Sequence, residues 1–101
     1  MKKKNKKNTD IFSKSISFDD NLILPVIFGS NDENLKKLED VFKVFILPRG
    51  NYLKIEGLQK NVETTSIILN KLYDGAIEGK IIDTGELEAI IKIFKNNELK
   101  P

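Results

Sequence analysis

The chain has 101 residues, of which 40% are hydrophobic, and it contains no cysteine and no histidine. This length allows one domain, and the missing residue types exclude disulfides, thiol nucleophiles, histidine bases and the commonest zinc sites. The formal charge of +2 is unevenly distributed, since without the five lysines of the first seven residues twelve basic residues face fifteen acidic ones. Those five are Lys2, Lys3, Lys4, Lys6 and Lys7.

The charge distribution divides the chain into a disordered basic tail (residues 1–10) and one domain (residues 11–101). A lysine block of this kind is either a solubilising terminus or a loose electrostatic arm for RNA. No segment approaches the roughly 20 apolar residues of a membrane span, and none has the apolar length of a signal peptide. We therefore expect a cytoplasmic protein without a membrane partner.

The first half of the domain predicts one strand and two helices. Residues 14–18 alternate polar and apolar side chains, which is typical of a half-buried strand. Residues 21–28 follow two aspartates that can cap a helix, but Pro25 requires this helix to be short or distorted. Residues 31–42 predict a longer amphipathic helix. The apolar faces are Ile16 and Phe18 in the strand, and Leu35, Leu38 and Phe42 in the longer helix.

The second half predicts a hairpin followed by two helices. Residues 43–47 and 51–56 are β-type runs, and the turn between them should place Gly50 and Asn51 at positive φ. A long helix over residues 59–78 should end at a glycine cap, Gly79. An Asp-x-x-Glu capping box at 83–86 begins the last helix. The apolar stripe of that helix is Leu87, Ile90, Ile91 and Phe94.

The stretch FGSNDENLKKL, residues 28–38, carries the clearest functional signal. Its spacing resembles the KH-domain consensus apolar-Gly-x-x-Gly-x-x-apolar-x-x-apolar, with Asp32 in place of the second glycine. The element order also resembles a type I KH domain (β-α-α-β-β-α) with an extra C-terminal helix. The resemblance implies an α+β, KH-like fold, in which a three-stranded sheet has helices packed on one face. It also implies nucleic-acid backbone near the loop, with phosphates beside amides at a helix N-terminus.

Asp32 leaves the activity of this loop open. Glycine suits phosphate contact because it has no side chain and adopts loop conformations freely. Asp32 is bulkier and negatively charged, and Ser30 with Glu33 forms a Ser-x-x-Glu capping box that would satisfy the free amides of the helix internally. The loop is thus either a degenerate phosphate-binding loop or only a turn and a cap.

Several short motifs together resemble the N-terminal KH-like domain of PhoH-like proteins, a bacterial family of P-loop ATPases. The matching runs are ISFDDN (16–21), FGSNDENLKKLED (28–40), PRGNYLKIEG (48–57) and LYDGAIEGKIIDTGELEAIIKI (72–93). The resemblance implies an accessory domain beside an ATP-binding ATPase domain. The Walker motifs of that ATPase domain are absent from this chain, since GAIEGKI (75–81) lacks their spacing and hydroxyl. We therefore expect neither an enzyme nor a cofactor site here.

The sequence leads to two functional hypotheses. In the first, the chain is an accessory module that binds single-stranded RNA for a PhoH-like ATPase. In the second, it is a structural module that docks onto the ATPase domain or self-associates through the C-terminal helix. The candidate nucleic-acid-binding residues are Gly29, Ser30, Asn31 and Asp32 in the loop, Lys36 and Lys37 in the following helix, and Arg49, Asn51 and Lys54 on the hairpin.

Overall fold

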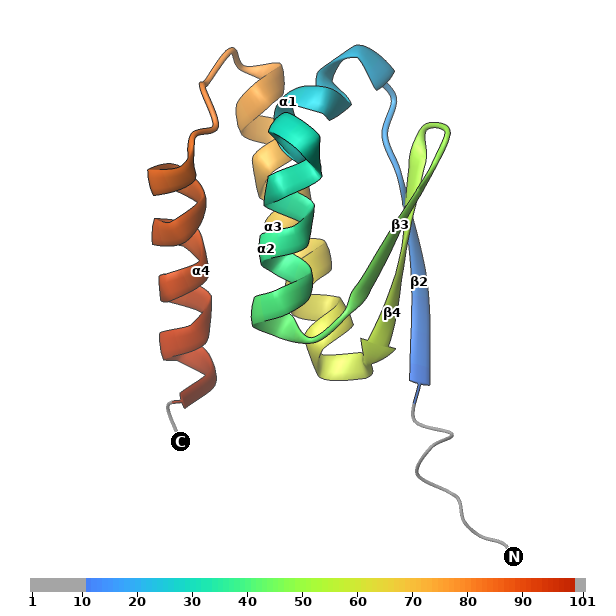
Figure 1. Cartoon of the computed structure of the whole chain (residues 1–101), viewed down its shortest axis with the longest axis vertical. Coiled ribbons are helices and arrows are strands. Elements are labelled where there is room, and N and C mark those ends of the chain that lie inside the picture. Colours follow the sequence, from blue (N-terminus) through green and yellow to red (C-terminus); the bar gives the residue numbers. More distant parts are fainter. Residues whose placement is uncertain (1–10, 100–101) are drawn as a thin grey trace, which may run out of the picture.

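The computed structural model describes residues 11–99 (Figure 1). The expected disordered tail, residues 1–10, lies outside the described residues, as do residues 100–101. The elements are β2 (Ile11–Ser17), α1 (Leu24–Phe28), α2 (Glu33–Phe42), β3 (Phe45–Arg49), β4 (Tyr52–Leu58), α3 (Gln59–Ile77) and α4 (Thr84–Leu99), with 3₁₀ turns at Asn21–Ile23 and Ser30–Asp32.

The three strands form one antiparallel sheet in the order β2-β4-β3. Strand β4 is central, and its Leu53 and Ile55 are fully buried against the helices. Their neighbours across the sheet are Ile16 on β2 and Ile46 on β3, which are buried as well. The alternate residues face away from the helices, because successive side chains of a strand point to opposite sides.

The helices among residues 11–99 all lie on one face of the sheet, as expected (Figure 1). In Figure 1, α1, α2 and α3 lie against the sheet and α4 lies beyond them, farthest from the strands. The stripe on α4 is used within the chain: Leu87 and Ile91 are buried, while Ile90 and Phe94 are partly buried against the core. This stripe therefore packs on the helical layer, with Leu87 and Ile91 inside and Ile90 and Phe94 at its edge.

The observed boundaries differ modestly from the expected ones. Strand β2 begins at Ile11 and not at residue 14, because its partner β4 continues to Leu58 and pairs with it there. Helix α1 is five residues long with Pro25 in its first turn, as the proline requires. The expectation of positive φ at Asn51 is wrong: in the two-residue turn only Gly50 has it, at 62°.

The helix ends follow the sequence more closely. Asp20 accepts the amide of Leu22, and Asp83 accepts the amide of Glu86 at 2.8 Å, which is the aspartate half of the expected capping box. Gly79, just past the end of α3, has φ of 90°. The architecture is that of a type I KH-like domain with an additional C-terminal helix, and this prediction is confirmed.

Candidate nucleic-acid interface

The loop between α1 and α2 has an unusual backbone. Gly29 adopts φ 80° and ψ 172°, a region that is essentially restricted to glycine, and its amide donates to the carbonyl of Pro25 at 3.0 Å. Asn31 and Asp32 follow with φ of 53° and 58°. Asp32 therefore stands at a left-handed position that glycine would occupy without strain, and aspartate is among the few other residues that tolerate it.

Gly29 also has a packing role. The side chain of Asn34 is 5% exposed, and its Nδ2 donates to the carbonyl of Ile27 at 3.0 Å. A Cβ atom on Gly29 would lie 2.9 Å from two atoms of the Asn34 amide. The fold thus needs glycine here whether or not a ligand contacts the loop.

The predicted capping box between Ser30 and Glu33 is wrong. No side chain caps α2, whose N-cap residue is Asp32. Ser30 lies too early for that role, inside the 3₁₀ turn, and backbone carbonyls satisfy the amides instead: Asp32 N–H donates to Gly29 at 3.1 Å and Glu33 N–H donates to Ser30. The turn therefore leaves fewer amides for an anion than an open helix end would.

The two lysines of α2 differ in their surroundings. Lys36 is exposed and makes no ion pair with any residue that the structure describes. Lys37 Nζ lies 3.0 Å from Glu88 Oε2 on α4, in a solvent-exposed pair that ties the two helices together weakly. Of the two, Lys36 is the one available for a phosphate.

The hairpin candidates do not join the loop. Arg49 and Tyr52 are paired on β3 and β4 and face away from the helices, as does Lys54, whose Nζ lies 3.2 Å from Glu56 Oε2. Asn51 is structural: its Nδ2 donates to the carbonyl of Phe18 and its own carbonyl accepts the Phe18 amide. The structure groups Gly29, Ser30, Asn31, Asp32 and Lys36, and it places Arg49 and Lys54 on the open sheet face and Asn51 in the hairpin turn.

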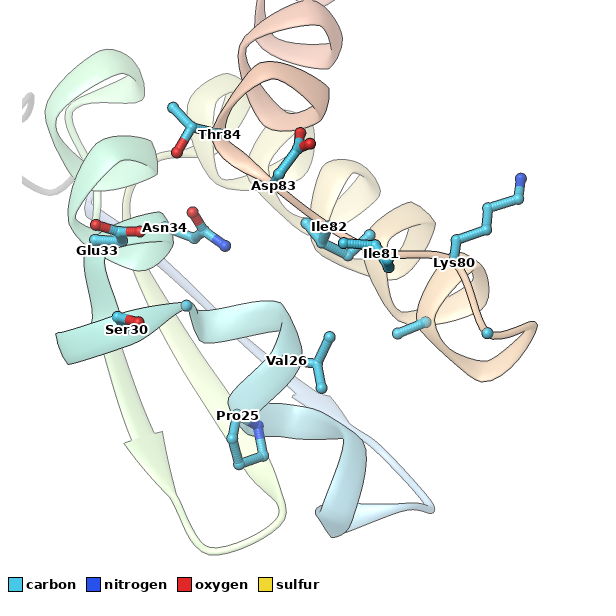
Figure 2. Close-up of a pocket in the computed structure, with 13 residues that line it drawn as sticks. Pro25, Val26, Ser30, Glu33, Asn34, Lys80, Ile81, Ile82, Asp83 and Thr84 are labelled. Atoms are coloured by element: carbon cyan, nitrogen blue, oxygen red, sulfur yellow. The ribbon is translucent and has the colours of Figure 1, made fainter.

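A cleft of about 630 Å³ lies beside the loop, between α1 and α2 on one side and the segment joining α3 to α4 on the other (Figure 2). We call it the linker cleft. The sequence does not indicate this site, because residues 79–84 are far from Gly29 along the chain and only the fold brings them together. The lining residues are Pro25, Val26, Gly29, Ser30, Glu33, Asn34, Ala76, Gly79, Lys80, Ile81, Ile82, Asp83 and Thr84.

Two kinds of feature are absent from the described residues. Within residues 11–99, no three His, Cys, Asp or Glu side chains lie close enough together to hold a metal ion. The same part of the chain contains no helix with the length and apolar character needed to cross a membrane.

Comparison with known proteins establishes the fold. No protein-family model and no curated protein matches the chain. A protein of unknown function from Aeropyrum pernix is similar over 88% of this chain and 51% of its own length, with a TM-score of 0.64 and 18% identity. Dim2p from Pyrococcus horikoshii OT3 is similar over 82% of this chain and 49% of its own, with a TM-score of 0.63 and 15% identity. The chain spans about half the length of these two structures.

Proposed function

We propose that this chain is a nucleic-acid-binding KH-like module, without catalysis of its own, that contacts single-stranded RNA through the Gly29–Asp32 loop. The observation that carries the proposal is the backbone of that loop within a KH-like fold. Gly29 and Asp32, at the two positions where the KH consensus has glycine, both have positive φ, which supports a loop that a phosphate could approach at the start of α2. Ser30 and Asn31 are exposed there, and Lys36 adds a cation that has no ion-pair partner among residues 11–99.

The expected mode is weak backbone binding with little sequence preference. The 3₁₀ turn already satisfies two of the amides near the start of α2, and Asp32 and Glu33 place negative charge beside any bound phosphate. Most of the affinity would then come from lysines, including those of the residue 1–10 tail, and it would be strongly salt-dependent. The bases of the RNA would contribute little to the affinity beyond apolar contact with the protein.

We further propose that the module serves a PhoH-like ATPase, with the catalytic domain outside this chain. The support is the motif set around Gly29, Asp32 and the Arg49-Gly50-Asn51 turn. The structure gives several of these residues a fold-building role: Asn34 and Asn51 make the bonds described above, and Glu39 Oε2 accepts the amide of Ile46 at 2.8 Å. The motif set therefore supports a domain in common with PhoH-like proteins more strongly than it supports a ligand in common with them.

A second candidate is a structural module that docks onto the ATPase domain and does not bind nucleic acid. The observation that favours it is the charge of the linker cleft, where Glu33 and Asp83 outnumber Lys80. An acidic cleft beside the loop is unfavourable for a phosphate backbone and suits a protein partner.

The test is a salt series of single-stranded RNA binding, measured by fluorescence anisotropy. The full chain is compared with a version lacking residues 1–8 and with Lys36→Ala, and Lys60→Ala is the matched control because it removes an exposed lysine at the start of α3. If the loop binds RNA, Lys36→Ala reduces the slope of log K against log salt concentration by about 0.7 in magnitude, for one lost phosphate contact, and Lys60→Ala leaves this slope unchanged. Binding that vanishes with the tail, or never appears, rejects the loop as a binding site and supports docking.

A further inference from the structure

The inner end of the linker cleft presents hydrogen-bond acceptors, and Lys37, which lines the adjoining pocket with Glu33 and Asn34, is paired with Glu88. Glu33 and Asp83 contribute carboxylates from the starts of α2 and α4, and Asn34 lies between them (Figure 2). The ammonium of Lys80 points away from these three residues in the same view. The Lys80 Nζ lies 3.9 Å from Oε1 of Glu78, a residue outside the cleft lining.

None of these acceptors is fully used by the described residues. Neither Glu33 nor Asp83 takes part in an ion pair within residues 11–99. One carboxylate oxygen of Asp83 accepts a hydrogen bond from the amide of Glu86. The Asn34 amide has a fixed orientation because its Nδ2 donates to Ile27. Its Oδ1 has no hydrogen-bond partner in the described part of the chain, although the residue is only 5% exposed.

Burying an acceptor without a hydrogen-bond partner lowers the stability of the fold, so a donor from a ligand at Asn34 Oδ1 would be favourable. The walls around it are apolar: Val26 on α1 and Ile81 on the opposite side are 45% and 82% exposed, and Pro25 and Ile82 extend these walls. The cleft thus joins an acceptor-lined end to a hydrocarbon-lined entrance.

We propose that the linker cleft binds an arginine side chain from a basic peptide segment of a partner protein. A guanidinium is planar, carries five N–H donors and matches a carboxylate in a bidentate fork, which a lysine ammonium cannot do. Its methylene stem would lie along Val26 and Ile81, and its donors would meet Glu33, Asp83 and Asn34 Oδ1. The charge complementarity selects this occupant over RNA, whose phosphates the two carboxylates repel.

This site goes beyond the proposed contact of RNA with Ser30, Asn31 and Lys36, and it survives if that contact fails. The chain's own tail is a poor occupant for two reasons. Residues 1–10 contain lysine and no arginine, and they join the domain at Ile11. The start of β2, which begins at Ile11, lies at the end of the molecule away from α1 and the start of α2 (Figure 1).

The experiment is a two-dimensional NMR titration of the full ¹⁵N-labelled chain with the blocked pentapeptide Gly-Ile-Arg-Ile-Gly. The matched probes carry citrulline, which is neutral and has nearly the same shape, or lysine at the centre. We expect saturable shifts of the Asn34 side-chain amide and of the backbone amides of Glu33 and Thr84 with the arginine peptide, weaker ones with lysine and none with citrulline.

Two variants locate the interaction. Glu33→Gln with Asp83→Asn removes both charges while keeping a cap for α4, since asparagine caps as well as aspartate. This variant should bind the arginine peptide at least about tenfold more weakly, whereas Asp19→Asn, an exposed carboxylate outside the cleft, should bind unchanged. Because Glu33 is exposed and caps nothing, Glu33→Gln alone gives the answer if the double variant is unfolded.

Three results would overturn the proposal. The first is equal binding of the citrulline peptide, which would show that the charge does not matter. The second is unchanged affinity of a folded Glu33→Gln variant. The third is a single-stranded RNA octamer that shifts the Asn34 and Thr84 signals while the arginine peptide leaves them in place, which would assign the cleft to nucleic acid. Deleting residues 1–10 should leave the arginine titration unchanged.

Discussion

Replacing Asp32 by glycine restores the residue that a KH loop carries, and the structure allows its two effects to be separated. Asp32 has φ of 58°, where a residue other than glycine is destabilised by roughly 1–2 kcal/mol, with aspartate toward the lower end. Glycine removes that strain but gains about 0.5–1 kcal/mol of unfolded-state entropy. We therefore expect Asp32→Gly to leave the free energy of unfolding within about 1 kcal/mol of wild type.

Asp32→Ala provides the comparison for the backbone. Alanine keeps the unfavourable φ that glycine relieves, so it should be less stable than Asp32→Gly by about 1 kcal/mol. Urea denaturation followed by circular dichroism measures both variants. If alanine and glycine are equally stable, the loop does not hold the left-handed conformation at Asp32 and the structural reasoning fails.

The charge effect is read from RNA affinity. One negative charge about 6 Å from a phosphate in water is unfavourable by about 0.7 kcal/mol, which is roughly threefold in affinity, and more where the dielectric constant is lower. Asp32→Gly and Asp32→Asn should both raise single-stranded RNA affinity by at least about threefold at low salt, since both remove the charge. Unchanged affinity in both variants would place the RNA away from the loop and refute the proposed contact.

Three further predictions test the elements that hold the loop. Gly29→Ala should lower the free energy of unfolding by at least about 2 kcal/mol, because it combines a glycine-only φ and ψ with a steric clash. The control is Gly85→Ala, where an added Cβ atom makes only ordinary van der Waals contact and φ is not positive. This variant should be as stable as wild type or more stable in the same urea experiment. Glu39→Gln weakens the bond to the β3 amide and should lower stability by about 1 kcal/mol, measured by thermal denaturation. The hydrogen bond and charge of Lys14 lower the pKa of Glu63 from its ordinary 4.5, so the contribution of this pair is present above pH 4.5 and is lost as the pH falls through the folded-state pKa. Stability measured from pH 6 to pH 3 should therefore fall slightly less in Glu63→Gln than in wild type.

Local patterns were sufficient to predict most elements of the fold. The alternation in β4 predicts Leu53 and Ile55 inside, and both are fully buried. Pro25 predicts the short α1, and the stripe of α2 predicts its buried face. The errors occur where a backbone interaction replaced an expected side-chain interaction. The 3₁₀ turn made the Ser30 cap unnecessary, and contacts with Phe18 hold Asn51 without positive φ.

The candidate site was harder to predict than the fold, because its residues come from distant segments. The loop could be located from the spacing of Gly29 and Asp32, and the alternation in β4 places Lys54 on the outer face, but nothing local shows that Arg49 faces away from the loop. That depends on the register of β3 with β4. The linker cleft depends on where α4 packs, which brings Asp83 and Thr84 opposite Glu33. The number of acidic and basic residues in the sequence does not predict the acidic cleft either. Which carboxylates remain without a partner depends on the ion pairs that form in the fold, such as Lys14 with Glu63 and Lys37 with Glu88.

The fold explains why residue 29 is glycine, but it does not explain why residue 32 is aspartate. Gly29 is required by the buried Asn34 amide and by its own backbone, so a domain that had lost RNA binding altogether would still need it. Asp32 has no such constraint: glycine or asparagine would fit its φ at least as well, and its side chain caps no helix. A carboxylate at the position proposed to face a phosphate is therefore the feature that the fold does not explain. Either it keeps RNA affinity low, or it serves a contact with a partner that is not an anion, and the Asp32→Asn affinity measurement separates these two explanations.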